Sequence, residues 1–175
     1  GNLAGRNGQG TESVAIGKEA GNTRQGFGAV AVGDLAGQTD QGDESIAIGN
    51  QAGQNGQKVK AVAIGYEAGV NGQNNDSVAV GFGAGAYGQG TGSTAIGHLS
   101  GQEGQNAYSV AIGFSAGANG QGVNAVAIGY AAGMVGQADN SIILNATASP
   151  LDNSTVPGFF VMPIRTQQNR NTLLY

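Results

Sequence analysis

The chain has 175 residues, a length that suits one domain, and a net charge of −4 with only 10% charged residues. No run of Lys or Arg offers a track for phosphates, so we expect no nucleic-acid partner. The chain lacks Cys, which excludes disulfides and thiolate metal sites, and no apolar run approaches the roughly 20 residues of a transmembrane helix. We therefore expect no membrane insertion.

A five-residue motif organises the chain. It first appears as Ser13-Val14-Ala15-Ile16-Gly17 and returns every 16 residues, with an altered ninth copy at 141–145. The 34 glycines would also suit a disordered chain, but disordered Gly-rich tracts lack such periodic Val and Ile. A fixed period of this kind is typical of repeat proteins in which each unit packs on its neighbours.

Each repeat divides into two halves. Val14 and Ile16 alternate with Ala15, which is the period-2 pattern of a strand, and the following Gly ends it. The second half carries an Ala-Gly pair and a Gly-Gln pair, which predict a second short strand between two bends. The sequence thus predicts an all-β fold over 1–145: a parallel β-roll or β-helix of 16-residue coils, two short strands per coil, stacked about 4.8 Å apart.

We expect the Val and Ile rows to fill the interior of this coil. The Ala between them would then form a smooth apolar stripe outside, which soluble monomers avoid exposing. A three-fold axis along the rod would cover the stripe, so we expect a homotrimer. The predicted interface is this stripe, or else the Ala row that begins at Ala20. The stripe consists of Ala15, Ala31, Ala47, Ala63, Ala79, Ala95, Ala111 and Ala127.

The repeat pattern breaks after Asn145. Residues 146–157 contain two prolines and predict a loop, and the apolar segment 158–164 is suited to covering the open end of the stack. We expect 146–175 to be a non-repeat cap and trimer foot that leads to a further domain downstream.

Two resemblances follow from these residues. The repeated S-V-A-I-G, A-G and G pattern over residues 4–145 resembles the head repeats of YadA-like trimeric autotransporter adhesins. That resemblance implies left-handed β-rolls wound as trimers, although the 16-residue unit is slightly longer than is typical there. The segment from Ser141 to Tyr175 resembles the region of phage and large DNA virus fibre proteins that precedes a cleavable trimerisation chaperone.

Two ladders of equivalent residues could bind a ligand. A Gln recurs at every repeat from Gln9 to Gln137, and we interpret it as a structural stack of amides rather than as a track for glycan hydroxyls. A row of rings follows the strand Gly in the later repeats; such a row either stacks on sugars or packs on itself. Its members are Tyr66, Phe82, His98, Phe114 and Tyr130.

We expect no catalytic site, no cofactor and no metal. His98 is the sole His and could meet its symmetry mates on a three-fold axis, but we interpret it as one more member of the ring row. The adjacent carboxylates Asp43 and Glu44 lie in a variable turn without a cleft. The remaining enzymatic alternative is a carbohydrate-active site formed between chains near Tyr66, Glu67 and Tyr130.

The predicted function is a structural, non-catalytic trimeric segment of a virion or phage surface fibre, acting as a spacer or an attachment rod. The alternatives are a bacterial trimeric adhesin head that binds host matrix or glycans, and the carbohydrate-active module. In each case we expect an extracellular location, on a virion or on a bacterial cell, and a possible glycan or protein receptor as the partner.

Overall fold

A computed structural model describes residues 1–152 and 155–164. Over these residues the chain forms strands, turns and bends and contains no helix, so none of it could cross a membrane as a helix. The strands are β1 (Asn7–Gln9), β2 (Val14–Ile16), β3 (Thr23–Gln25), β4 (Val30–Val32), β5 (Thr39–Gln41), β6 (Ile46–Ile48), β7 (Val62–Ile64), β8 (Val78–Val80), β9 (Thr94–Ile96), β10 (Val110–Ile112), β11 (Val126–Gly129), β12 (Ile142–Asn145) and β13 (Phe159–Met162).

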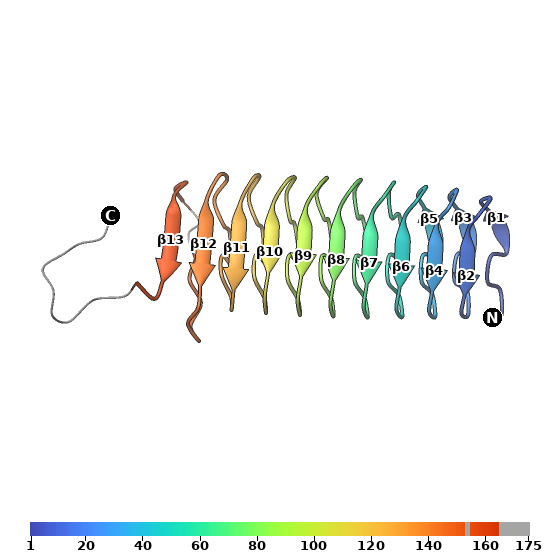
Figure 1. The fold of residues 1–175 in the computed structure, drawn as a ribbon, viewed down its shortest axis with the longest axis horizontal. Helices are drawn as coiled ribbons and strands as arrows, with labels where there is room; N and C mark the ends of the chain where they lie inside the picture. The colour runs from blue at the N-terminus through green and yellow to red at the C-terminus, as the bar shows by residue number, and fades with distance from the viewer. Residues whose placement is uncertain (153–154, 165–175) are drawn as a thin grey trace, which may run out of the picture.

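One parallel sheet of ten strands runs the length of the molecule, in the order β13-β12-β11-β10-β9-β8-β7-β6-β4-β2. Its register steps by one repeat, since Val62 pairs with Val78 and Ala63 pairs with Ala79. Figure 1 shows these strands side by side along the long axis, all pointing the same way. The predicted all-β parallel solenoid of 16-residue coils is confirmed.

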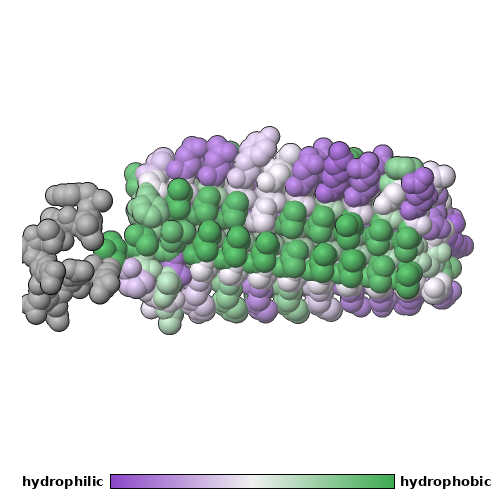
Figure 2. Space-filling model, in the orientation of Figure 1, coloured by the Kyte–Doolittle hydropathy of each residue, from purple (hydrophilic) through white to green (hydrophobic). Residues whose placement is uncertain are grey.

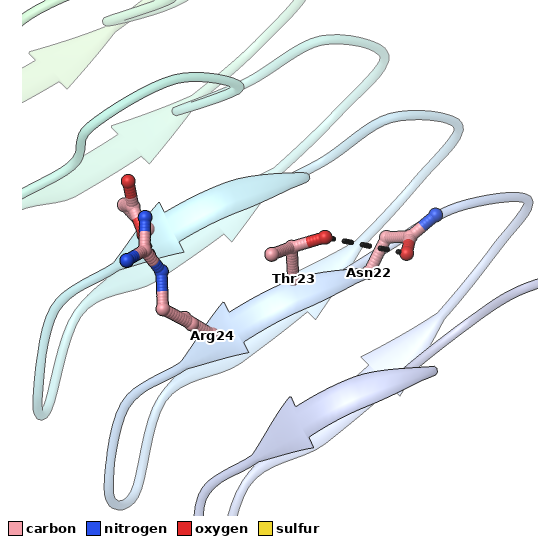
Figure 3. Close-up of polar contacts among 4 residues, drawn as sticks. Asn22, Thr23 and Arg24 are labelled. Atoms are coloured by element: carbon pink, nitrogen blue, oxygen red, sulfur yellow. Dashed lines mark hydrogen bonds and ion pairs between the residues drawn. The ribbon is translucent and has the colours of Figure 1, made fainter.

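The opposite wall of the coil is less regular than we predicted. It forms a three-stranded parallel sheet, β1-β3-β5, and then continues from Thr39 as single bridges, one per coil. The wall is most regular where Arg24 and Asp40 replace the Gly found in the later coils, and the two side chains form an ion pair. Figure 3 shows Arg24 leaving β3 beside Thr23, whose hydroxyl contacts Asn22. Among the described residues, two full strands per coil occur only at this end, in the coils that carry Gly8, Arg24 or Asp40 at this position.

The interior of the coil is lined by Ala, which corrects our assignment of its two faces. Ala63 and Ala79 have no exposed surface and pack on Ala68 and Ala84 of the opposite wall. A coil with one strand on one wall and a turn on the other leaves little space between its walls, and that space holds small Ala side chains beside the buried Gln and Ser side chains. The Val and Ile side chains therefore lie on the outer face of the sheet.

The stack continues beyond the last repeat. β13 pairs with β12 in parallel register, with Ile142 opposite Phe159, and the ring of Phe160 packs on the buried cluster around Ile143. Leu151 of the intervening loop packs on the same cluster. The residues expected to lead to a downstream domain, 165–175, lie outside the described part of the chain.

Candidate functional site

The outer face of the ten-stranded sheet is apolar along its length. We call it the apolar face; it comprises the first and third positions of the strands β2, β4 and β6 to β12. Ile64, Ile96 and Ile128 keep 37%, 38% and 39% of their surface exposed, and Ile16 at the first coil keeps 58%. Figure 2 shows two adjacent rows of hydrophobic side chains running along this face. Continuous apolar surfaces of this kind mark interaction sites on soluble proteins.

The glycine after each strand determines how closely the coils stack. Gly65 has a φ of 128°, and a Cβ built on it would lie 2.5 Å from the carbonyl oxygen of Gly81 in the next coil. Any side chain at this position would therefore separate adjacent coils. The repeated Gly keeps the Val and Ile of successive strands in register and in two straight rows.

The predicted Ala interface is wrong. Ala31, Ala47, Ala63, Ala79, Ala95, Ala111 and Ala127 have 0% exposed surface in a single chain, and Ala15 at the first coil is half-buried. Side chains that are enclosed by their own coil have no surface available for contact with another subunit. Because successive strand residues point to opposite faces, the surface available to a partner is the Val and Ile face on the other side.

The Gln ladder is structural, as we interpreted it. Gln73 is fully buried, and its Nε2 donates to the carbonyl of Val62 at 2.7 Å and to Oε1 of Gln89 at 3.1 Å. The same bonds recur from Gln57 to Gln137, so each amide joins the sheet to the next coil. Gln9 in the first coil is the exposed member. Because these amides are buried and bonded within the coil, they are not accessible to a glycan.

The five rings of the predicted row lie in one continuous stack. We call Tyr66, Phe82, His98, Phe114 and Tyr130 the aromatic row. Adjacent ring centroids are 5.0–5.4 Å apart and adjacent planes differ by 4–10°. Each inner ring thus has its two faces covered by neighbours and presents an edge to solvent.

Equal exposure along the aromatic row supports this geometry. Tyr66 and Tyr130 at its two ends are 46% and 44% exposed, against 48% for Phe82 within the row. An open face at either end would make the end rings the most exposed, and neither is. Sugars stack on ring faces, where CH groups meet the π system, so the row is a poor platform for a pyranose.

Tyr66 has an acidic neighbour, Glu67. Its hydroxyl donates a hydrogen bond to the Glu67 side chain, and this bond, together with the negative charge of Glu67, raises the pKa of Tyr66 above its ordinary value. Tyr130 lies at the other end of the row, beyond three intervening rings. One chain does not bring Tyr66, Glu67 and Tyr130 together.

Metal binding gains no support from the geometry. Among residues 1–152 and 155–164, no group of three or more His, Asp or Glu side chains is placed to hold an ion. His98 lies between Phe82 and Phe114, with centroids 5.0 and 5.1 Å away, as the ring-row interpretation predicted.

One surface was missed by sequence reasoning. The two residues that precede the Ser or Ala at the start of each repeat form a turn. These turns follow the edge of the apolar face at which the strands begin, whereas the aromatic row follows the edge at which the strands end. We call these positions (11–12, 27–28 and so on to 139–140) the turn edge. Exposed apolar side chains gather there: Phe27, Val59, Tyr108 and Val123. These positions vary between repeats, which conceals them from a search for a shared motif.

The comparisons with known proteins agree with this architecture. The family model described as "YadA head domain repeat (2 copies)" matches residues 57–84, 73–100 and 105–132, which together cover less than half of the chain. No match covers the C-terminal segment, so the predicted resemblance to viral fibre proteins gains no support. The searches of curated proteins and of solved structures returned no match. The central coils are thus similar to the repeats of an adhesin head.

Proposed function

We propose that this chain is a non-catalytic rod from an extended surface protein and that it works as a homotrimer. The observation that carries the proposal is the apolar face. Two rows of mostly Val and Ile side chains extend over the ten-stranded sheet from β2 to β12, and nothing in the described chain covers them. Covering this face in an assembly would remove a large apolar surface from water.

Three copies around an axis along the rod would cover the apolar face of every subunit. Closed cyclic symmetry gives every subunit the same environment and leaves no unmatched copy of the interface. The similarity of the central coils to YadA head repeats supports the same assembly, because heads of that family are trimeric. The same similarity supports an extracellular location.

Light scattering on the purified chain tests the proposal. We expect a mass about three times 17.2 kDa. The variant Ile96→Asp places a charge in the middle of the apolar face, and we expect it to yield monomers that retain the β-sheet circular dichroism of the parent. The matched control is Asn119→Asp, which adds the same charge on the exposed opposite wall and should remain trimeric. A monomeric parent chain, or an Ile96→Asp trimer of undiminished stability, would refute the proposal.

Between the two kinds of surface rod, the family match favours an adhesin head over a viral spacer. The two hypotheses predict different binding to immobilised host molecules. An adhesin head should bind immobilised host matrix protein or glycan saturably, whereas a spacer should bind neither above the level of an unrelated trimeric rod. Incubation with the same glycans tests the carbohydrate-active alternative, since turnover that Glu67→Gln abolishes would show an enzyme.

A further inference from the structure

Assembly about a three-fold axis along the rod determines which edges of the apolar face can meet. Rotation about that axis keeps equivalent coils of all three subunits level, and the strands run across the axis (Figure 1). The contacts in a closed ring are heterologous, so the strand ends of one subunit meet the strand starts of the next. The aromatic row of one subunit therefore lies beside the turn edge of its neighbour, with each ring level with the turn of the same coil.

The width of the apolar face suits such a ring. Packed sheets lie about 10 Å apart, so three sheets that face a common axis at about half this distance enclose a triangle with sides of roughly 17 Å. From Tyr108 on the turn edge to Phe114 in the aromatic row the chain takes six residue steps, which span at most about 20 Å of extended backbone. The two edges of each sheet thus lie at the corners of the triangle, where adjacent subunits come into contact.

The apolar side chains of the two edges match when equivalent coils are level. Three of the exposed apolar residues on the turn edge lie in coils that carry a ring, and the fourth, Phe27, lies in a coil without one. The three level pairs are Val59 with Tyr66, Tyr108 with Phe114, and Val123 with Tyr130. Tyr108 is 64% exposed, and among the described residues no ring stacks on it. Because a ring edge packs favourably on the face of another ring, the exposed edge of Phe114 suits the Tyr108 of a neighbour.

The charges also favour level coils. Lys18, which lies in line with the aromatic row in the first repeat, is then opposite Glu12, and the pair has opposite charges. Displacing the neighbour by one coil sets Asp34 against Glu44 in one direction and against Glu12 in the other, and both pairs have like charges. Juxtaposed like charges oppose association. The alignment that the symmetry requires is thus also the one that the charges of the two edges favour.

We propose that the aromatic row is a subunit contact and that each ring packs on the turn edge of the neighbouring subunit at the level of the same coil. This inference rests on the proposed trimer and deepens it, because it assigns the row to assembly rather than to a receptor. The occupant of the row is a second copy of this chain. Stacked rings that present only their edges are suited to this role, since the side chains of a turn can pack along them.

Cysteine cross-linking tests the contact, and the chain has no native Cys that would interfere. Phe114→Cys is combined either with Tyr108→Cys, in the same coil, or with Asn140→Cys, two coils further along. Both turn-edge positions are exposed and have similar φ values of 58° and 54°, so they are matched in geometry. A disulfide needs Cα atoms roughly 4.4–6.8 Å apart. The width of the sheet prevents a bond between 108 and 114 of one chain, and a displacement of two coils, about 10 Å, puts residue 140 of a neighbour out of reach.

We expect covalent trimers on a non-reducing gel from the pair 108/114 and none from the pair 114/140. The single variants are controls, since one Cys per chain joins at most two chains. Light scattering under reducing conditions reports the assembly separately. Covalent trimers from 114/140 would overturn the level alignment, and reduced trimers that cross-link in neither pair would overturn the subunit contact while leaving the proposed function intact. A monomeric mass in the parent chain would overturn both.

A comparison of two tyrosines provides a second test that needs no disulfide. Tyr108 on the turn edge is 64% exposed, whereas Tyr87 is 46% exposed on the opposite wall of the coil. In an isolated chain the more exposed ring should matter less. In the proposed trimer Tyr108 is enclosed by a neighbour, so Tyr108→Ala should raise the concentration at which trimers dissociate by about tenfold or more, and Tyr87→Ala should leave it unchanged. Analytical ultracentrifugation measures both, and equal values for the two variants would overturn the contact.

Discussion

Gln73 donates a side-chain N–H to Oε1 of Gln89 at 3.1 Å, one coil further along, and both amides are fully enclosed. Gln89 in turn donates to the carbonyl of Val78 at 2.7 Å and to Oε1 of Gln105 at 3.3 Å. The amides thus form a line of hydrogen bonds through the interior, beside the Ala rows. Each amide ties the strand carbonyl of one coil to the amide of the next.

Replacing one of these amides should therefore destabilise the coil. Gln89→Leu keeps the approximate size but leaves buried polar groups without partners, which costs about 1–3 kcal/mol in the free energy of unfolding. Gln9→Leu is the matched control, because Gln9 occupies the same ladder position in the first coil and is exposed. Chemical denaturation of both variants measures the difference, and equal losses would show that burial of the amide is not the cause.

The assignment of inner and outer faces can be tested with neighbouring residues of β8. Ala79→Leu forces a larger side chain between the two Ala rows, and we expect a loss of at least about 1–3 kcal/mol from overpacking. Val78→Ile adds one methylene group on the outer face and should change the melting temperature little. Should Val78→Ile prove the more damaging of the two, our assignment of the faces would be reversed.

Glycines that lie against the backbone of the next coil matter more for coil stacking than glycines with open space around them. Gly81→Ala would place a Cβ 2.5 Å from the carbonyl oxygen of Gly97, so we expect the adjacent coils to separate and the variant to lose more than about 3 kcal/mol. Gly56 has a φ of 72° but open space around its Cβ position. Gly56→Ala should therefore lose about 1 kcal/mol, from backbone strain alone. Thermal unfolding followed by circular dichroism distinguishes them, and similar melting temperatures would contradict this account.

The pKa of Tyr66 should lie above its ordinary value, because the Tyr66 hydroxyl donates a hydrogen bond to Glu67 and the charge of Glu67 disfavours a second negative charge nearby. Because the folded-state pKa is raised, the bond favours the folded state below the ordinary tyrosine pKa, and this contribution disappears as the pH rises through the raised value. Glu67→Gln should lower the pKa of Tyr66 toward its ordinary value. Ultraviolet difference titration of the parent and of Glu67→Gln measures this; superimposable curves would exclude the interaction.

Much of the fold follows from spacing alone. The 16-residue step predicted parallel strands in unbroken register, and the structure pairs Val62 with Val78 as that step requires. The stacking of His98 between two phenyl rings and the structural role of the Gln ladder also follow from placing equivalent residues above one another.

The inner and outer faces could not be predicted in the same way. Alternation shows that Ala79 and Val78 lie on opposite faces, but it does not show which face is enclosed. Hydrophobicity favours Val and Ile inside, yet the repeat coils are so thin that the inner strand position holds Ala from β4 to β11, beside the extended Gln amides, and a larger side chain, Ile143, is enclosed only at the last coil. Which face is enclosed depends on the dimensions of the coil, and these depend on the turns at both ends of the strand. The turn edge was missed because its residues differ from coil to coil.

The direction of the hydrogen bonds between coils determines how the rod responds to force. Strand-to-strand bonds such as that from the Val62 amide to the Ser77 carbonyl link one coil to the next, along the line of pulling. Tension applied at the two ends would load the outermost coil first and peel coils one at a time. Each released coil of 16 residues would extend by roughly 50 Å, against the ~4.8 Å that it occupied in the stack. A rod of this design can lengthen many-fold under load while its remaining coils keep their structure.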